Sequence, residues 1–167
     1  AEPFSAVLDL LYTLPGLDKN PMTAIAILSE IGPDMSVFPS SKHLVSWAGC
    51  CPRNDQSNQK VKSRRISRAG SYLKPLLVQV ANALIKSKKH PEFKERYHRI
   101  KSRRGHKKAI IAVCKMLLTA IWNMLSKLEP YNPEGFLEHR PVKQEKTLTV
   151  SQALELLRLR GYTITNQ

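Results

Sequence analysis

The chain has 167 residues, of which 42% are apolar, and its 27 Lys and Arg residues outnumber 13 Asp and Glu residues. This length and apolar content suit one folded domain with a core, alone or followed by a tail. The net charge of +14 favours a polyanionic partner, with nucleic acid first and an anionic membrane surface second. No apolar run approaches the roughly 20 residues of a bilayer span, and no secretory signal pattern is present, so we expect a soluble intracellular protein.

Three helices are predicted in the first fifty residues. The first ends at the Leu-Pro-Gly stretch of residues 14–16. The second begins with Asn20 as its N-cap and Pro21 as its first residue, and its inward face is expected to include Ile25, Leu28 and Ile31. The third is short and occupies residues 40–49, between a serine cap and a terminal glycine.

Further helices follow a polar segment. A leucine stripe over residues 73–84 predicts a helix that tolerates Pro75 only in its first turn. Another helix starts at Pro91, and residues 106–128 form a long apolar helix whose neighbours must cover most of its surface. Only residues 60–66 hint at a strand, so the fold class is mainly α. Phe38, Trp47 and Trp122 are predicted to lie in the core.

The chain is expected to divide near residue 130. Residues 1–130 are predicted to form a compact helical domain with a long basic loop. Residues 131–167 are predicted to form a linker and a C-terminal helical tail, with a cap at Thr149 or Ser151 and a stop at Gly161.

Basic residues concentrate in two segments. Residues 53–74 hold seven Lys and Arg against Asp55 alone, and residues 86–108 hold eleven against two acids, so together they contain 18 of the 27 cations. Like charges at this density destabilise an isolated protein, which favours phosphates as their partners. The alternative is that these residues form ordinary solvated helix surfaces.

The first helix pair resembles a helix-hairpin-helix, in which a glycine-containing turn offers backbone N–H groups to a DNA phosphate. Gly16 supplies the turn, and Lys19 is the nearby cation, so both are expected to contact nucleic acid. Asp18 stands where the usual motif has a second glycine. The alternative is a plain helical hairpin that only packs into the core.

Several motifs then occur in a definite order. They are "LPG" with "TAIAILSEIG", "FPSSKHLVSWAG", "PRNDQS..K", "RISRAGSYLKPLLVQ" and "RRGHKKAIIAVCKMLL". This ordered set, over residues 11–128, resembles the C-terminal transposase domain of the insertion-sequence one-ten family. Members of that family are recombinases with a DEDD nuclease half that use a bridge RNA to pair donor and target DNA.

The resemblance implies a nucleophilic serine that follows a Pro-Arg pair and precedes a lysine. Pro52 and Arg53 match the pair, Ser57 matches the serine and Lys60 matches the lysine. Residues 58–59 are Asn-Gln, where the family commonly has small residues. Without the resemblance, Ser57 could not be distinguished from Ser63 or Ser67. The residues expected to bind nucleic acid, besides Gly16 and Lys19, are Arg53, Lys60, Lys62, Arg64, Arg65, Arg68, Arg103, Arg104, Lys107 and Lys108.

The resemblance further implies strand cleavage through a covalent phosphoserine–DNA link and rejoining to another strand. No cofactor is expected in this chain: its acids are scattered, its five histidines share no ligand spacing, and its three cysteines form no paired motif. Mg²⁺ is expected in an N-terminal nuclease half that this chain lacks, which would leave the chain alone inactive.

The expected partners are donor and target DNA and a guide RNA, with no membrane. The full-length protein is expected to form a homo-oligomer in the bacterial cytoplasm, associated with the nucleoid. The alternative is a noncatalytic helical module that binds DNA or RNA by charge and shape.

Overall fold

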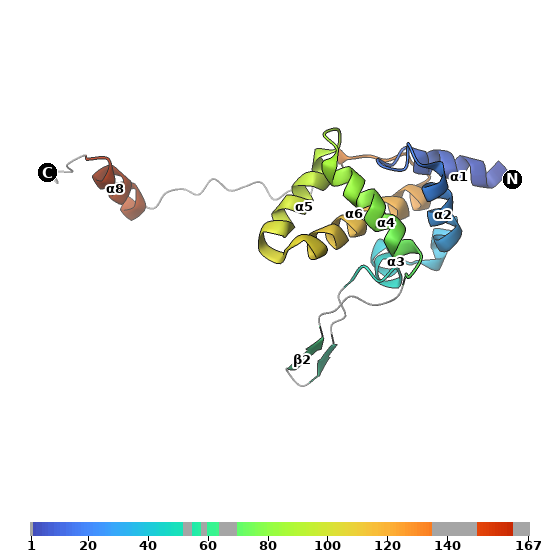
Figure 1. The fold of residues 1–167 in the computed structure, drawn as a ribbon, viewed down its shortest axis with the longest axis horizontal. Helices are drawn as coiled ribbons and strands as arrows, with labels where there is room; N and C mark the ends of the chain where they lie inside the picture. Colours follow the sequence, from blue (N-terminus) through green and yellow to red (C-terminus); the bar gives the residue numbers. More distant parts are fainter. Residues whose placement is uncertain (1, 52–54, 58–59, 64–69, 135–149, 162–167) are drawn as a thin grey trace. The chain divides into compact units, whose positions relative to one another are not determined.

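The computed structural model describes residues 2–51, 55–57, 60–63, 70–134 and 150–161 (Figure 1). Contacts divide the chain into two units, Ala1–Gly135 and Phe136–Gln167. The elements in chain order are α1 (Glu2–Tyr12), α2 (Pro21–Ile31), the 3₁₀ turn η1 (Met35–Val37), α3 (Ser41–Trp47), β1 (Asp55–Ser57), β2 (Lys60–Ser63), α4 (Leu73–Lys86), α5 (Pro91–Arg104), α6 (His106–Lys127) and α8 (Val150–Leu159). The predicted mainly α fold is confirmed.

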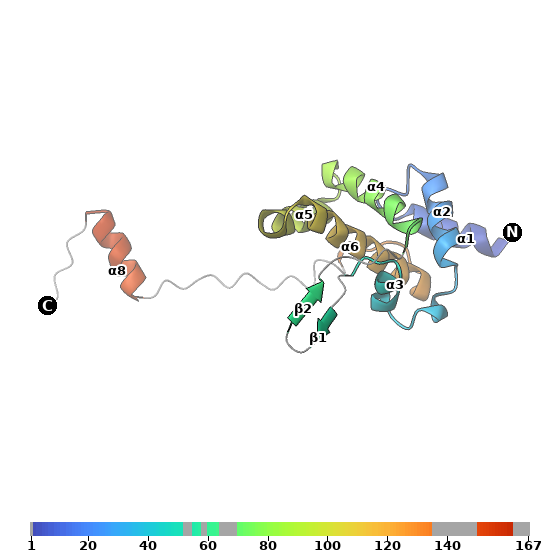
Figure 2. The same cartoon turned by 60° about the horizontal axis from the view of Figure 1, so that its bottom comes forward.

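Helix α6 forms the centre of the first unit. It packs against α1, α3, α4, α5 and η1, and Figure 2 shows α4 and α5 running alongside it. Ten of its residues are buried, because neighbours cover several sides of the helix. By length and composition α6 could also cross a membrane. A buried core helix meets the same criteria, and α6 has that role within this unit.

The start of α2 confirms the expectation from the sequence. Asn20 occupies the N-cap position and Pro21 the first helical position, although the Asn20 side chain makes no capping hydrogen bond. The expected inward position of Ile25 is wrong, because its side chain is 43% exposed. Leu28 and Ile31 are buried, as predicted. The same helical face also buries Thr23, Ala24 and Ile27.

The three aromatic residues expected in the core differ in burial. Phe38 is buried, and its backbone carbonyl accepts a hydrogen bond of 2.9 Å from the indole N–H of half-buried Trp122. Trp47 is 45% exposed, so its placement in the core is wrong. It ends the short helix α3, and its ring meets Phe38 edge-on with 5.6 Å between ring centroids. One side of Trp47 therefore packs while much of the ring remains open to solvent.

Tyr131 follows the end of α6 and packs against the first unit. Its ring stacks on buried Phe93, its hydroxyl donates a 3.0 Å hydrogen bond to the buried carboxylate of Glu92, and its backbone N–H donates to the Thr13 hydroxyl. Burial, followed by the charge of Glu92, raises the pKa of Tyr131. The packed part of the first unit thus extends past residue 130, where the sequence suggested a boundary. The division of the chain into a domain and a tail remains a prediction.

Replacing Tyr131 with Phe is expected to destabilise the first unit. The ring stack survives, but the buried Glu92 carboxylate loses a hydrogen bond, which typically costs about 1–3 kcal/mol. Because the folded-state pKa of Tyr131 lies above its usual value of 10, this group contributes stability that is complete below pH 10 and is lost as pH rises further. Chemical denaturation at several pH values should therefore show a steeper alkaline loss of stability in the parent than in Tyr131→Phe. Equal pH profiles would contradict this assignment.

The second unit contributes α8 in its described part. The helix begins at Val150, so Ser151 lies inside it and is not its cap, while Thr149 lies outside the described residues. Gly161 follows the helix with a φ of 81°, as expected for a stop. Leu154, Leu156, Leu157 and Leu159 are all exposed.

Candidate nucleic-acid interface

The polar segment that carries Ser57 leaves the helical core at a capped helix end. Gly49 follows α3 with a φ of 66°, and its N–H donates a hydrogen bond to the Ser46 carbonyl. The next N–H, of Cys50, reaches back to the Val45 carbonyl at 3.0 Å. This pair of hydrogen bonds is a common glycine-dependent helix ending. The chain therefore departs from α3 in a defined direction.

The same segment returns to the core at Gly70. This glycine has a φ of 66°, and a Cβ atom at its position would lie 2.4 Å from the carbonyl oxygen of Ala48. Its own carbonyl accepts a hydrogen bond from Lys74 in the first turn of α4. The two ends of the segment thus touch each other, and only glycine fits the contact.

A two-stranded hairpin lies between these ends. Strands β1 and β2 are antiparallel; Ser57 pairs with Lys60 and Gln56 with Val61, with an irregularity beside Asp55 (Figure 2). Only the second strand was suggested by the sequence. The Asp-Gln-Ser stretch of β1 has little strand propensity of its own, and it is a strand because it pairs with β2.

The hairpin brings three predicted site residues together along the backbone. Ser57 ends β1, Lys60 begins β2 opposite it, and Lys62 follows in β2. Ser63, an alternative nucleophile, ends β2 opposite Asp55. The predicted contacts Arg53, Arg64, Arg65 and Arg68, together with Ser67 and the Asn58-Gln59 pair, lie outside the described residues.

A second basic surface forms where α5 meets α6. Arg103 and Arg104 lie in the last turn of α5, Gly105 turns the chain with a φ of 82°, and Lys107 and Lys108 lie in the first turn of α6. All four cations are exposed. We call these four residues the α5–α6 corner. The structure therefore brings four of the residues predicted to bind nucleic acid together around one tight turn.

Interactions that the sequence did not indicate support this corner. The Tyr97 hydroxyl and His106 Nδ1 are 2.8 Å apart, which joins the buried face of α5 to the start of α6. Lys101 lies over the Tyr97 ring, 5.4 Å from its centroid. Partial burial, followed by the charge of Arg99, lowers the pKa of Arg96. Positive charges on α5 therefore affect one another in the free protein.

Replacing Lys107 and Lys108 with Ala is expected to weaken binding to duplex DNA and to flatten its salt dependence. The logarithmic salt slope should fall by roughly 0.9 for each phosphate that the variant no longer neutralises. Fluorescence anisotropy over a salt series measures both quantities. Lys115→Ala provides a matched control, because this exposed lysine lies further along the same helix. A slope unchanged from the parent would exclude the corner from the interface.

The α1–α2 turn has a strong packing role. A Cβ atom on Gly16 would lie 2.8 Å from a Val80 methyl group, so α4 packs directly on this glycine. The Gly16 N–H already donates to the Asp18 carboxylate at 3.2 Å. Both observations favour the plain packed hairpin over a phosphate-binding turn. Lys19 is exposed, and contacts of Gly16 and Lys19 with nucleic acid remain predictions.

Apart from basic side chains, the described residues include few groups that are arranged for catalysis. No group of three or more His, Cys, Asp or Glu side chains that could hold a metal ion occurs among them. Burial raises the pKa of Cys50 to about 11 and that of Cys114 to about 12, which keeps both thiols protonated and unreactive at neutral pH.

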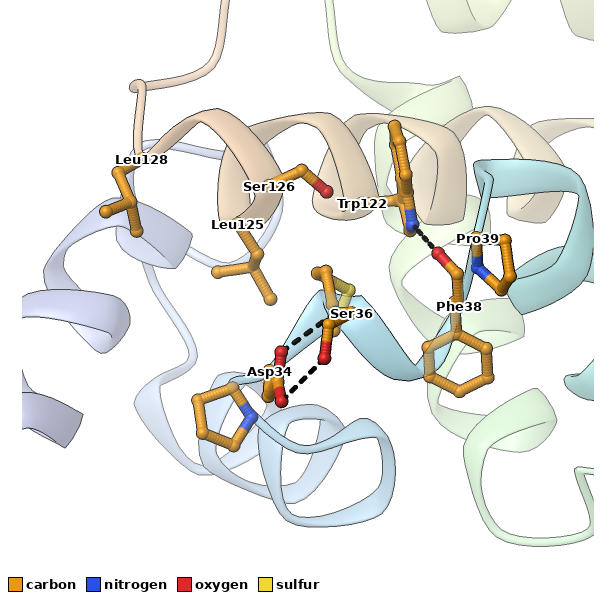
Figure 3. Close-up of a pocket in the computed structure, with 10 residues that line it drawn as sticks. Asp34, Ser36, Phe38, Pro39, Trp122, Leu125, Ser126 and Leu128 are labelled. Atoms are coloured by element: carbon orange, nitrogen blue, oxygen red, sulfur yellow. Dashed lines mark hydrogen bonds between the residues drawn. The ribbon is translucent and has the colours of Figure 1, made fainter.

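A surface pocket of about 480 Å³ lies between η1 and the end of α6 (Figure 3). Its lining comprises Pro33, Asp34, Met35, Ser36, Phe38, Pro39, Trp122, Leu125, Ser126 and Leu128. The Asp34 carboxylate accepts hydrogen bonds from the backbone N–H and the hydroxyl of Ser36, and these bonds lower its pKa. This carboxylate is thus engaged in capping η1 and is a poor general base, so the pocket lacks the features of a phosphoryl-transfer site.

The first unit is a helical domain that carries a two-stranded hairpin and, separately, the exposed α5–α6 corner. The family model described as "Transposase IS116/IS110/IS902 family" matches residues 8–98, more than half of the chain. The chain therefore belongs to this transposase family. The matched range contains the hairpin, all of α2 and the second half of α1.

Curated relatives agree with this membership. The pilin gene-inverting protein of Moraxella bovis is 30% identical over 125 residues, which cover 74% of this chain and 38% of the relative. The transposase for insertion sequence element IS1111A of Coxiella burnetii is 29% identical over 124 residues, covering 72% and 33%. The chain thus spans less than two fifths of the length of these relatives. No solved structure matches it.

Proposed function

We propose that this chain is the serine-bearing half of an RNA-guided DNA recombinase and that Ser57 is its nucleophile. The observation that carries the proposal is the position of Ser57 at the end of β1, directly opposite Lys60, on a hairpin within the segment whose two ends meet at Gly70 and Ala48. Six further Lys and Arg residues lie between positions 53 and 74. A basic surrounding suits an attack on a phosphodiester, because negative charge grows on the phosphoryl oxygens.

The proposed step exchanges one phosphorus–oxygen bond for another. The Ser57 oxygen bonds to phosphorus as the bond to one bridging oxygen of the DNA strand breaks. The serine proton passes to a base, and the departing oxygen takes up a proton. Because the phosphoserine link keeps the phosphate in a diester, a hydroxyl of another strand can reverse the step and rejoin the DNA.

Within the described part of the chain, the acids form no group that could hold a metal ion. Mg²⁺ in a DEDD nuclease half, guidance by RNA, homo-oligomer formation, and a bacterial cytoplasmic location near the nucleoid are parts of the same proposal. The short coverage of the relatives is consistent with a further segment in the whole protein.

The second candidate is a noncatalytic module that binds DNA or RNA. The exposed α5–α6 corner favours it, because four cations can hold a backbone without any hydroxyl chemistry. Trapping a covalent protein–DNA adduct from the full-length protein distinguishes the two. A nucleotide mapped to Ser57 by mass spectrometry supports the recombinase, whereas the absence of any adduct under conditions of strand cleavage supports the module.

A further inference from the structure

We call β1 and β2 with the turn between them the serine hairpin, and the contact between Ala48 and Gly70 its stem. Two exposed aromatic side chains lie next to this stem in the sequence. Trp47, the last residue of α3, is 45% exposed, and Tyr72, directly before α4, is 75% exposed. Large aromatic side chains usually bury much of their surface, so two exposed ones beside one segment need an explanation.

The close approach of the two chain segments at the stem limits the distance between these aromatic residues. Trp47 adjoins Ala48, Tyr72 lies two residues after Gly70, and Ala48 touches Gly70. Chain geometry therefore keeps the Cα atoms of Trp47 and Tyr72 within roughly 16 Å of each other. A single strand of several nucleotides, the usual size of such a binding site, is long enough to span this distance.

The Trp47 ring is held in place before any ligand arrives. It packs edge-on against Phe38. The Phe38 carbonyl in turn accepts a hydrogen bond from the Trp122 indole N–H (Figure 3). A ring fixed in this way loses little entropy when a flat partner stacks on its open part.

The surrounding charge selects the kind of partner. Between Asp34 and Glu92 the sequence holds Asp55 as its single acid, against eleven Lys and Arg residues. On α3 itself, Lys42 is exposed. A single strand of nucleic acid suits both features of this part of the chain, because its phosphates bind cations and its bases stack on aromatic rings.

We propose that Trp47 and Tyr72 form a stacking site for unpaired DNA bases beside the serine hairpin. In the proposed function a cleaved DNA strand must leave its partner strand before it is rejoined to another, so its bases are then unpaired. The site rests on the proposed function in its placement beside Ser57 and in the choice of DNA as its ligand, while stacking itself requires no cleavage.

The test measures binding of the whole 167-residue chain to oligonucleotides, with no cleavage step. The probes are a single-stranded DNA, the same strand carrying a run of abasic positions, the corresponding RNA and a duplex. Trp47→Leu keeps an apolar contact with Phe38 while removing the indole, and Tyr72→Leu changes a side chain that is mostly exposed. Phe4→Leu, at another exposed aromatic residue on α1, serves as the control.

Each variant of the pair is expected to bind single-stranded DNA roughly 5-fold to 100-fold more weakly, with an unchanged salt slope and unchanged duplex binding. The parent should bind the abasic strand more weakly than the intact one, and Trp47 fluorescence should be quenched on binding, a signal that Trp47→Leu removes. Equal binding of abasic and intact strands, or full affinity in both variants, would overturn the site. Tighter binding of RNA than of DNA would overturn the assignment to DNA. A failure of Ser57 chemistry leaves all these measurements unaffected.

Discussion

Changing Ser57 to Ala in the full-length recombinase is expected to abolish strand cleavage and the covalent adduct while nucleic-acid affinity stays nearly constant. Removing an attacking hydroxyl typically costs on the order of 10³-fold or more in rate. A single hydroxyl contributes little to a contact dominated by charge. Cleavage of labelled DNA and denaturing gel analysis of the adduct measure the first effect, and binding anisotropy measures the second.

The controls for this prediction come from the same segment. Ser63→Ala, at the end of β2, and Ser67→Ala should both retain cleavage. Replacing Arg64 and Arg65 should weaken binding as well as cleavage, because each arginine removed is a cation expected to face phosphate. Survival of the adduct in Ser57→Ala, or its loss in Ser63→Ala or Ser67→Ala alone, would show that the nucleophile was assigned wrongly.

Changing Gly70 to Ala is expected to destabilise the first unit by about 2–5 kcal/mol. A left-handed backbone costs a residue with a Cβ roughly 1–2 kcal/mol, and forcing an extra atom into a packed contact adds about 1–3 kcal/mol. The new Cβ would lie 2.4 Å from the Ala48 carbonyl oxygen, which belongs to backbone and cannot rotate away. Thermal denaturation followed by circular dichroism should show a decrease in Tm of roughly 5–15 °C.

Gly105→Ala is the matched control for this substitution. Gly105 also has a positive φ, 82°, but nothing lies within 4 Å of a Cβ at its position. With a ψ of 169°, Gly105 lies in a backbone region that is almost exclusive to glycine, so the variant should show only the backbone cost of about 1–3 kcal/mol. If both variants lose the same stability, the contact between Gly70 and Ala48 contributes nothing beyond backbone strain, and the hairpin stem is less constrained than the structure indicates.

Most helices could be predicted from the sequence because their determinants are local. The Asn20-Pro21 start of α2, the Pro91 start of α5 and the long apolar period of α6 each act through a few neighbouring residues. Which residues of a helix are buried was harder to predict. Ile25 is exposed because the α2 contacts select a neighbouring stripe, and a short helix with many apolar residues does not specify which stripe is buried.

The candidate site shows the same division. The ordered motifs in the sequence indicated Ser57, Lys60 and the basic segments, and the family match supports the class of protein. The pairing of β1 with β2 and the exposure of Trp47 were not predictable from spacing, because each depends on residues that are distant in the sequence or lack a propensity of their own.

The sequence alone determined the helical class, the excess of positive charge and the ordered motifs, since composition and local periodicity are properties of the chain itself. Only the tertiary structure decided the roles of the glycines. Gly16 packs under α4, Gly70 joins the two ends of the serine segment, and Gly105 is open to solvent, although all three have a positive φ. Local sequence sets the backbone freedom of a glycine, but the atoms that approach it come from other elements, and their approach is a property of the folded chain.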